Sequence, residues 1–375
     1  MIYRPFWINR LNETWKLRSI VWMSGVRRSG KTTLAKMISG AQYYNCDMPS
    51  VVKQLGDPEY FFRNIRDGSI IIFDEIHRLE NPDIVLKIAA DEFPGLKILA
   101  TGSSTLSAVK KFRDSLTGRK INLYFPPVLW NECLSDFKIN DIDRRLLFGG
   151  LPELLLADRI NYDFYSEWID SYYARDIQEL FNIRNRTGFL KLLNIIFLQS
   201  GGLMDVSGLA KNAGLSRPTV LMHLEALQTA HAVNVVPPFF GGGRKEIVKR
   251  PKIYAFDTGF VSFVNGWGEI RDDDRGLLWE HLVLDMLKVK FKNVFYWRNK
   301  NKNEVDFVIK KHGNVVDTFE CKVNPLKFDP QSLLLFRKFY PKGNNYCLSP
   351  HIPNPYFQRF NDVEVKFIST ADRVE

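Results

Sequence analysis

The chain has 375 residues, of which 45% are hydrophobic and 25% charged, and this composition excludes a wholly disordered or fibrous protein. At this length we expect two or three domains rather than one. Lysine and arginine number 52 against 42 acidic residues, so the formal net charge is +10. Composition alone leaves two explanations for this excess: solvated surface charge, or a polyanionic partner such as nucleic acid.

Cysteine usage and hydropathy bear on the cellular compartment. The four cysteines, Cys46, Cys133, Cys321 and Cys347, form no Cys-x-x-Cys pair and suit neither a zinc site nor a disulfide framework. The N-terminus lacks the charged-then-apolar order of a signal peptide, and no apolar run reaches the roughly 18–20 residues that span a bilayer. We therefore expect a cytoplasmic protein without a membrane segment.

Apolar runs and helical stretches alternate in the first third of the chain. Strands are predicted at residues 19–24, 69–74, 96–102 and 121–125. Continuous apolar strands separated by helices favour a parallel sheet that is covered on both faces. The chain as a whole is predicted to be an α/β protein. After this core come a mostly helical stretch, a compact helix–turn–helix with a hairpin, and a segment of mixed helices and strands.

A phosphate-binding loop follows the first predicted strand. Gly25-Val-Arg-Arg-Ser-Gly-Lys-Thr matches the pattern G-x-x-x-x-G-K-[ST] and precedes a helix-like stretch. Its glycines let backbone N–H groups wrap phosphates, and the helix N-terminus adds a favourable dipole. Lys31 is expected to reach the β- and γ-phosphates of ATP, and Thr32 to ligate Mg²⁺. The residues predicted to bind the nucleotide here are Gly25, Arg27, Arg28, Ser29, Gly30, Lys31, Thr32 and Thr33.

Two further predicted strands end in polar residues. In Ile70-Ile-Ile-Phe-Asp-Glu, Asp74 is expected to hold Mg²⁺ through its water shell, and Glu75 to polarise the attacking water as general base. The third strand ends in Ala100-Thr-Gly-Ser-Ser, where Ser103 is the candidate for sensing the γ-phosphate. ATP and Mg²⁺ are therefore the predicted cofactors.

In this order of motifs the chain resembles the AAA-type ATPases. The phosphate loop, the Asp-Glu strand and the polar sensor strand are followed by Ser115-Leu-Thr-Gly-Arg, just before the fourth strand. The resemblance implies that Arg119 reaches the nucleotide of a neighbouring subunit and stabilises charge on the γ-phosphate, which ties hydrolysis to assembly. The alternative for Arg119 is a surface arginine at a turn.

Further motifs narrow the resemblance to a prokaryotic ATPase family in which an AAA-like motor precedes a C-terminal domain of unknown function. Besides the loop and the Arg119 motif, they are Gly149-Gly-Leu-Pro-Glu, Tyr173-Ala-Arg-Asp-Ile and Pro251-Lys-Ile-Tyr-Ala-Phe-Asp-Thr-Gly. The last two are less specific, and the resemblance covers nearly the whole chain. Arg175 has two interpretations: contact with the nucleotide, or a salt bridge with Asp176 or Glu179, which we favour.

Residues 206–227 have the pattern of a helix–turn–helix. Leu209 and Ala210 are expected to face inward from the first helix, and Gly214 to make the turn. Ser216 can cap the second helix, whose predicted core stripe is Val220, Leu224 and Leu227. With the following hairpin, tipped by Gly241-Gly-Gly, the segment resembles a winged helix.

The resemblance to a winged helix implies a set of DNA contacts. DNA-binding versions place the second helix in the major groove. The exposed candidates are Arg217, Thr219 and His223, with Arg244 and Lys245 on the wing. A protein-contact module is the alternative, because this helix carries only moderate positive charge.

Acidic residues and a lysine recur near the C-terminus. Asp306 is predicted to close a hairpin strand, while Glu320 and Lys322, two residues apart, share one face of the next strand. With Glu280 on an upstream helix as accessory acid, the set resembles the PD-(D/E)xK nuclease core. Asp306 and Glu320 would hold Mg²⁺, which activates water and polarises the scissile phosphate, and Lys322 would orient the nucleophile. A nuclease fold that has lost activity is the alternative.

The segment beside this candidate site is basic. Residues 288–311 include eight basic and two acidic residues, with Phe291, Phe295, Tyr296 and Trp297 among them. Such a mixture favours a polyanion that is neutralised by the basic groups and stacked on aromatics. The strand-like alternation at residues 294–297 instead predicts that most of these aromatics belong to the core.

Taken together, the motifs favour an ATP-hydrolysing, DNA-binding AAA-type motor with a nuclease-like domain. The predicted modules are a P-loop ATPase core (1–130), a helical lid (131–198), a winged helix (199–250) and a restriction-endonuclease-like α/β domain (251–375). The order of motor, lid and winged helix is similar to the Holliday-junction branch-migration motors, which implies a homo-oligomer such as a hexameric ring. DNA repair, recombination and defence against mobile DNA are the expected settings. The alternative is a nucleotide-dependent signalling switch whose nuclease-like domain is structural or binds protein.

Overall fold

A computed structural model of the chain describes residues 2–102, 115–178, 181, 183, 185–241 and 250–370. The chain divides into two compact units. The first consists of Met1–Pro127, Trp168–Ile183 and Glu225–Ala232, and the second of Val128–Glu167, Arg184–Leu224 and Val233–Glu375. We describe each unit by itself. The predicted module boundaries at 130/131, 198/199 and 250/251 stay predictions.

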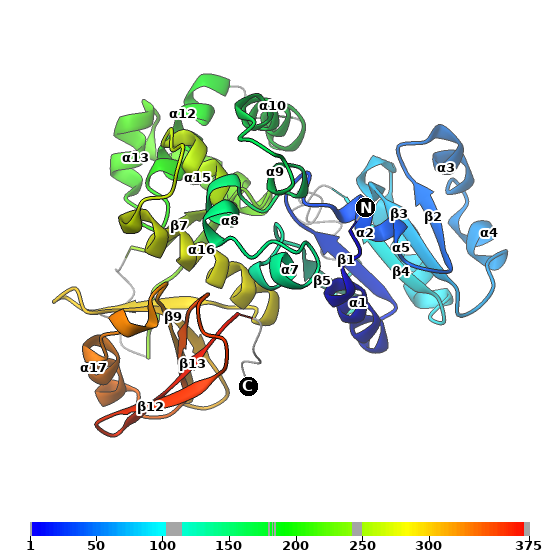
Figure 1. Cartoon of the computed structure of the whole chain (residues 1–375). Helices are drawn as coiled ribbons and strands as arrows, with labels where there is room; N and C mark the ends of the chain where they lie inside the picture. Colours follow the sequence, from blue (N-terminus) through cyan, green and yellow to red (C-terminus); the bar gives the residue numbers. More distant parts are fainter. Residues whose placement is uncertain are drawn as a thin grey trace. The chain divides into compact units, whose positions relative to one another are not determined.

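A parallel sheet forms the centre of the first unit (Figure 1). Its strands, in spatial order, are β2 (Ala41–Asn45), β3 (Ile70–Asp74), β4 (Lys97–Thr101), β1 (Ile20–Ser24) and β5 (Lys120–Tyr124). All neighbouring strands run parallel, as expected from their apolar runs. Strand β2 was not predicted, because this edge strand is only half-buried and its sequence Ala-Gln-Tyr-Tyr-Asn contains no apolar run.

The helical elements of the first unit are α1 (Pro5–Leu17), α2 (Lys31–Lys36), α3 (Pro49–Gln54), α4 (Pro58–Arg63), η1 (Ile76–Arg78), α5 (Pro82–Glu92) and the π-helix η3 (Tyr173–Gln178). A proline starts α1, α3, α4 and α5, where its missing N–H costs no hydrogen bond. Trp22, Phe73 and Ile98 on the sheet pack in one core with Phe62 and Leu86. Because the strands are parallel, the loops after β1, β3 and β4 leave the same edge of the sheet.

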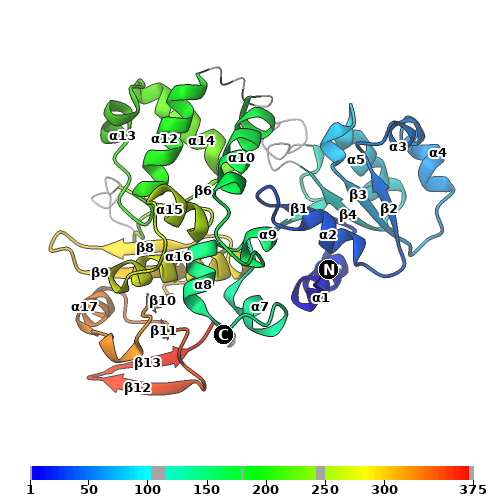
Figure 2. The ribbon, with the colours of Figure 1, turned by 45° about the horizontal axis from the view of Figure 1, so that its top comes forward.

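Helices dominate the first part of the second unit, where Figure 2 shows α12 and α13 close together. The helices from residue 130 to residue 264 are α7 (Trp130–Ser135), α8 (Ile142–Phe148), α9 (Pro152–Leu155), α10 (Tyr162–Tyr172), α12 (Arg186–Leu198), α13 (Val206–Ala213), α14 (Arg217–Thr229) and α15 (Thr258–Val264). Helices α10 and α14 continue into the residues of the first unit. No described helix is long and apolar enough to cross a bilayer.

The helix–turn–helix pattern is confirmed in α13 and α14. Gly214 ends α13 in the left-handed conformation, with φ +68°, and the N–H of Thr219 donates to Ser216 Oγ at 3.2 Å as the predicted cap. The predicted inward residues are all buried: Leu209, Ala210, Val220, Leu224 and Leu227. The strands that follow, β6 (Val233–Val236) and β7 (Lys252–Ala255), pair antiparallel, so a hairpin follows the second helix. Arg244 and Lys245 lie outside the described residues.

Two motifs of the expected family meet in the second unit. Asp257, the N-cap of α15, accepts hydrogen bonds from the N–H groups of Gly150 at 2.6 Å and Gly259 at 2.9 Å. The Arg145 guanidinium lies 3.9 Å from the same carboxylate, and both side chains are buried. Gly149 has a φ of +81°, and a Cβ there would come within 1.9 Å of Asp257 Oδ1. The role of these residues is thus to join α8 to α15.

A mixed sheet fills the C-terminal part of the second unit (Figure 2). Its strands, in spatial order, are β12 (Tyr356–Phe360), β13 (Val363–Ile368), β11 (Asn345–Leu348), β10 (Val316–Cys321), β9 (Glu304–Lys310) and β8 (Phe295–Arg298). Helices α16 (Asp272–Lys290) and α17 (Gln331–Phe339) pack against it, and η5 (Pro325–Lys327) follows β10. Strands β8, β9 and β10 form an antiparallel meander, whereas β11 runs parallel to β10.

Candidate functional site

The phosphate loop is the turn between β1 and α2. Lys31 Nζ donates to the carbonyl oxygens of Gly25 at 2.8 Å and Val26 at 2.9 Å, so the lysine lies across the loop. A Cβ at Gly25 would lie 2.1 Å from the carbonyl oxygen of Phe125, and Gly30 has a φ of +99°. The two glycines of the motif are therefore required by a close backbone approach and by a left-handed turn.

The remaining loop residues differ in their surroundings. Arg28 is exposed with a φ of +61°, and Thr33 is exposed as well. Ser29 is buried, its carbonyl oxygen accepts from Arg4 Nη1 at 3.3 Å, and its Oγ finds no partner among the described residues. Thr32 is half-buried beside Lys31 at the start of α2. The loop therefore presents Lys31 and Thr32 together, as a nucleotide with Mg²⁺ requires.

Asp74 ends β3 and is held from both sides. Its Oδ2 accepts from Tyr43 Oη at 2.6 Å, and its Oδ1 accepts from Thr101 Oγ1 at the end of β4. The N–H of Glu75 donates to the same Thr101 Oγ1 at 3.3 Å. Thr101 thus touches both predicted acids, and the sequence did not single it out. Its place as the last residue of β4 was the available signal, whereas Ser103, our sensor candidate, lies outside the described residues.

Glu75 is held in the left-handed conformation, with φ +56°. Burial raises the pKa of its carboxyl group, an effect opposed by the charge of Lys31 and reinforced by Asp74. His77 Nδ1 lies 3.2 Å from Glu75 Oε2, yet burial lowers the pKa of His77 to about 4. At neutral pH the imidazole is therefore uncharged, and this contact is not an ion pair. A raised pKa suits a general base.

These groups surround one cavity of about 160 Å³. Its lining residues are Gly25, Arg27, Lys31, Asp47, Glu75, His77, Arg78, Gly102, Arg175 and Asp176. Asp176, one of the two acids that we expected to pair with Arg175, lies 3.7 Å from Arg27 Nη1 of the phosphate loop, and Glu179 lies outside the described residues. Burial lowers the pKa of Lys31. Three arginines from separate segments, Arg27, Arg78 and Arg175, therefore line the cavity together with three acids.

Arg119 lies directly before β5. Its Nε and Nη2 donate to Oδ1 and Oδ2 of Asp91, on α5, at 2.6 and 3.0 Å. Arg119 is absent from the lining of the cavity. Its side chain is about one-third exposed at 33%. This placement agrees with both earlier interpretations, a residue that acts on another subunit and a surface ion pair.

A second group of charged side chains lies in the C-terminal part of the chain. Lys322 Nζ is 3.3 Å from Glu320 Oε2 and 3.8 Å from Asp306 Oδ2. Asp306 Oδ2 also accepts from the N–H of Cys321 at 2.8 Å. Asp306 is the third residue of β9, which pairs with β8 from Glu304 onward and continues to Lys310. Our prediction that Asp306 closes the strand is therefore wrong. The three predicted residues are otherwise brought together as expected.

Glu280, on α16, has partners that the sequence did not reveal. Its Oε2 accepts from Tyr254 Oη at 2.9 Å and lies 3.5 Å from Lys252 Nζ, and the same Nζ lies 2.5 Å from Glu304 Oε1. Although burial opposes its charge, the carboxylates of Glu280, Asp306 and Glu304 raise the pKa of Lys252. Lys252 and Tyr254 alternate along β7, so they share one face. This spacing of two residues, in a strand that is otherwise apolar, was the local feature that could have indicated partners for a buried acid.

Asp306 and Glu320 are buried, whereas Glu280 is half-buried. Burial and the neighbouring Asp306 raise the pKa of both Glu280 and Glu320. Glu320 Oε1 is buried without a hydrogen-bond donor among the described residues. A cavity of about 550 Å³, lined in part by Glu280, Lys322 and Lys327, opens beside the group.

Mg²⁺ fits this second group through Asp306 and Glu320. In the described part of the chain, no group of three or more His, Cys, Asp and Glu side chains is arranged to hold a metal ion. Mg²⁺ is commonly held by one or two carboxylates with water and substrate phosphate completing its shell. The unpartnered Oε1 of Glu320 supplies a free oxygen for such an ion.

Several basic residues of the segment 288–311 have polar or acidic partners within the chain. Lys288 Nζ donates to Asn234 Oδ1, Arg298 pairs with Glu304 and Lys311 pairs with Asp317. The remaining basic side chains are exposed: Lys290, Lys292, Lys300, Lys302 and Lys310. Tyr296 and Trp297 are buried, as the strand-like alternation predicted.

The exposed face of α14 differs from the prediction. His223 is 1% exposed and packs against the ring of Phe189, because it shares the inward face with Val220 and Leu224; we had expected it to be exposed. Arg217 is exposed, as expected. Leu221 and Met222 are 52% and 49% exposed, so two apolar side chains lie on the outward face, which also carries Arg217, Glu225 and Gln228.

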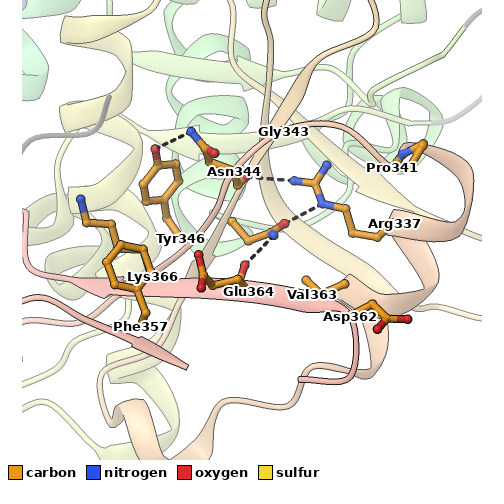
Figure 3. Close-up of a pocket in the computed structure, with 11 residues that line it drawn as sticks. Arg337, Pro341, Gly343, Asn344, Tyr346, Phe357, Asp362, Val363, Glu364 and Lys366 are labelled. Atoms are coloured by element: carbon orange, nitrogen blue, oxygen red, sulfur yellow. Dashed lines mark hydrogen bonds between the residues drawn. The ribbon is translucent and has the colours of Figure 1, made fainter. Parts of the chain in front are cut away.

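A further cavity, of about 430 Å³, is lined by residues of α17, β11 and β13 (Figure 3). Arg337 donates there to the carbonyl oxygens of Val316 and Asn344 and to Asn345 Oδ1. Asn344 in turn donates to Tyr346 Oη at 3.3 Å. Because the Arg337 donors point into the protein framework, we assign no binding function to this cavity.

Three family models match the chain in succession. Residues 17–134 match an AAA domain family, residues 139–271 a domain of unknown function (DUF8612), and residues 275–364 another domain of unknown function (DUF4143). The parallel sheet, the phosphate loop and this match define an AAA-type ATPase domain in the first unit. The two segments that follow this domain match families of unknown function.

Relatives cover most of the chain at low identity. An uncharacterized protein of Mycobacterium tuberculosis is 26% identical over 319 residues, covering 81% of this chain and 70% of its own length. An uncharacterized protein of Methanocaldococcus jannaschii is 27% identical over 322 residues, covering 76% and 70%. These relatives extend the similarity beyond the AAA domain into the segments that follow it.

Solved structures are more distant. A RuvB variant of Thermotoga maritima has a TM-score of 0.32 and 21% identity, and covers 63% of this chain and 90% of its own. A signal-transduction ATPase with a tetratricopeptide repeat sensor from Pyrococcus horikoshii has a TM-score of 0.29 and 15% identity, and covers 76% and 45%. At these scores we base no argument on them.

Proposed function

We propose that this protein hydrolyses ATP in a homo-oligomer and acts on DNA, with a C-terminal domain of the metal-dependent nuclease type. The observation that carries the proposal is the convergence of Lys31, Glu75 and Arg175 on one cavity, with Asp74 adjoining. A lysine, a carboxylate with a raised pKa and arginines are the groups that bind and cleave a terminal phosphate. DNA repair, recombination and defence against mobile DNA are the proposed settings, in the cytoplasm.

Each residue of the nucleotide site has a proposed task. The backbone N–H groups of the loop from Gly25 to Thr33 and the Lys31 ammonium bind the phosphates, and Thr32 and Asp74 hold Mg²⁺. Bound Mg²⁺ supplies charge neutralisation at the β- and γ-phosphates. Glu75 orients the attacking water and accepts its proton. His77, neutral at physiological pH, lies against the Glu75 carboxylate and restricts its position.

Arg119 is proposed to complete the site of a neighbouring copy. It is absent from the cavity of its own chain, so a role in catalysis requires a second subunit. An arginine supplied in this way stabilises charge that develops on the γ-phosphate. A hexameric ring is the arrangement we propose.

The C-terminal site is proposed to bind a phosphodiester. Asp306 and Glu320 hold Mg²⁺, which supplies polarisation of the phosphate and activation of water when bound. Lys322, between the two carboxylates, orients the nucleophile or offsets developing charge. The exposed lysines of residues 290–310 attract the polyanion.

The experiment that tests the ATPase proposal is turnover by the full chain with duplex, branched or single-stranded DNA added in turn. We expect DNA to stimulate hydrolysis and Lys31→Ala to abolish it. Lys36→Ala, a lysine at the end of the same helix, is the matched control and should retain activity. Unchanged hydrolysis in Lys31→Ala would refute the assignment of this site.

Cleavage is tested separately. Plasmid DNA and RNA are incubated with the chain and Mg²⁺ or Mn²⁺, and nicking is expected to disappear in Lys322→Ala but to persist in Lys327→Ala, a lysine of the same cavity wall. If the unmodified chain cuts no form of DNA or RNA, the domain is a binding or structural element.

A nucleotide-dependent signalling switch is the second candidate, and two exposed apolar side chains of α14 favour it. Leu221 and Met222 offer a surface for protein rather than for phosphate. Salt distinguishes the two candidates, because DNA affinity that rests on several phosphate contacts falls steeply with ionic strength. Arg217→Ala should weaken DNA binding and lower the salt slope by about one, whereas Leu221→Ser should not. If only Leu221→Ser impairs function, the switch is favoured.

A further inference from the structure

Lys252 is a buried cation between two acids of the C-terminal group. Its side chain is 6% exposed, and its ammonium contacts Glu304 on β9 and Glu280 on α16. Tyr254, two residues along β7, donates to the same oxygen of Glu280 that faces Lys252. Glu280 is therefore fully engaged by protein donors on that oxygen.

The other two acids are engaged differently. Lys322 is shared between Glu320 and Asp306 at longer distances, 3.3 and 3.8 Å, and its side chain is 29% exposed. Glu320 Oε1 is buried, and no donor of the described residues reaches it. The group thus has two sides. On one side lie Asp306 and Glu320, and Glu320 has an unpartnered oxygen. On the other side the negative charges of Glu280 and Glu304 are compensated by Lys252.

We propose that Lys252 is a built-in cation that takes the place of a second divalent ion, so that the C-terminal site binds one Mg²⁺, at Asp306 and Glu320. An ammonium is a compact point charge, and between two carboxylates it supplies the compensation that a metal ion would otherwise supply. Glu280 then serves as the counter-ion of Lys252, and it is not a metal ligand. The proposal rests on the metal-dependent site proposed above.

Charge balance leads to the same result. Four carboxyl groups, of Glu280, Glu304, Asp306 and Glu320, face three cationic groups, of Lys252, Lys322 and Arg298. With all four carboxyl groups ionised, one negative charge remains, and a single divalent cation already exceeds it. Two divalent cations would bring a cation close to Lys252, where desolvated like charges repel strongly.

The test counts bound ions directly. Mn²⁺ is titrated into the full chain without nucleotide, and binding is followed by calorimetry and by the electron paramagnetic resonance signal of free Mn²⁺. Every variant carries Asp74→Asn, which removes the ion of the nucleotide site. We expect the parent to bind one Mn²⁺, Asp306→Asn to bind none, and Glu280→Gln to bind one with its affinity changed by less than about threefold.

Removal of the lysine is the decisive change. Lys252→Met is expected to bind a second Mn²⁺, and Lys252→Met with Glu280→Gln to bind only one. A folded Lys252→Met chain that still binds one ion, or a parent that binds two, overturns the inference while the metal site itself stands. A parent that binds none refutes the metal site. If Lys252→Met does not fold, loss of the ion in Glu280→Gln overturns the inference on its own.

Discussion

Arg119 and Asp91 form a two-pronged ion pair within one chain, with Nε–Oδ1 and Nη2–Oδ2 distances of 2.6 and 3.0 Å. Parallel contacts of this kind fix the direction of the guanidinium as well as its charge. If Arg119 completes the nucleotide site of a neighbouring subunit, it must either break its contacts with Asp91 or be held by Asp91 in an orientation that reaches that subunit. The pair therefore connects the oligomeric state to the nucleotide site.

Replacement of Arg119 should separate catalysis from binding. We expect Arg119→Ala to lower kcat by about a thousandfold, in the range reported for arginines supplied in trans, while ATP affinity changes little. Asp91→Asn, which keeps the side-chain shape but weakens the hold on Arg119, should retain turnover. Steady-state kinetics and fluorescent-nucleotide titration measure both. If Arg119→Ala and Asp91→Asn lower the thermal stability equally and neither changes kcat, the pair is purely structural.

Thr101 is predicted to position both acids of the nucleotide site. Thr101→Val keeps the shape and removes the hydroxyl that contacts Asp74 and the Glu75 N–H. Because a hydrogen bond to a charged group is worth about 1.5–3 kcal/mol, kcat should fall by about ten- to a hundredfold. Tyr43→Phe removes the donor to the other oxygen of Asp74 and is the matched control. It should reduce Mg²⁺–ATP affinity more than kcat.

Stability should fall on acidification because of His77. Its folded-state pKa of about 4 lies below the ordinary value, so between about pH 6.5 and 4 the unfolded chain binds the extra proton. The contribution of neutral His77 to the free energy of unfolding is complete above about pH 6.5, the pKa in the unfolded chain. It is lost as the pH falls toward about 4, the pKa in the folded chain. His77→Gln should flatten the difference in unfolding free energy between pH 7 and pH 5 by about 1–2 kcal/mol. Urea unfolding at the two pH values measures this, and an unchanged slope would contradict it.

Asp257 should be among the residues most important for stability in the second unit. It is buried, accepts two backbone N–H groups and faces the buried Arg145. Asp257→Ala leaves that guanidinium without its counter-ion, so we expect a loss of about 3–5 kcal/mol. Glu59→Ala breaks the exposed pair with Arg63 and should cost less than about 1 kcal/mol. Thermal denaturation compares the two, and similar shifts would contradict the prediction.

Local sequence was sufficient wherever the chemistry lies in consecutive residues. The phosphate loop and Asp74-Glu75 were found because each directly follows an apolar strand, and such strands end at one edge of a parallel sheet. The helix–turn–helix was equally visible, because its buried residues recur at helical spacing. His223 was misassigned because one helix face was judged from residue type alone, and the packing against Phe189 was not visible in the pattern.

Contacts between distant segments could not be predicted in the same way. Thr101 meets Asp74 across 27 residues, and Lys252 meets Glu280 across 28, and neither pair has a spacing that marks it. The pairing of Arg119 with Asp91 and the engagement of Asp176 by Arg27 are of the same kind.

The sequence by itself determined that this chain contains a phosphate-binding α/β core with two adjacent acids, and that an Asp, Glu and Lys recur near its end. The reason is that strand, turn and motif depend on neighbouring residues. Only the tertiary structure decided which partner each charge has: Lys252 for Glu280, Asp91 for Arg119, and Thr101 for Asp74. Those partners are selected by burial and by the pairing of distant strands and helices, which no local pattern encodes.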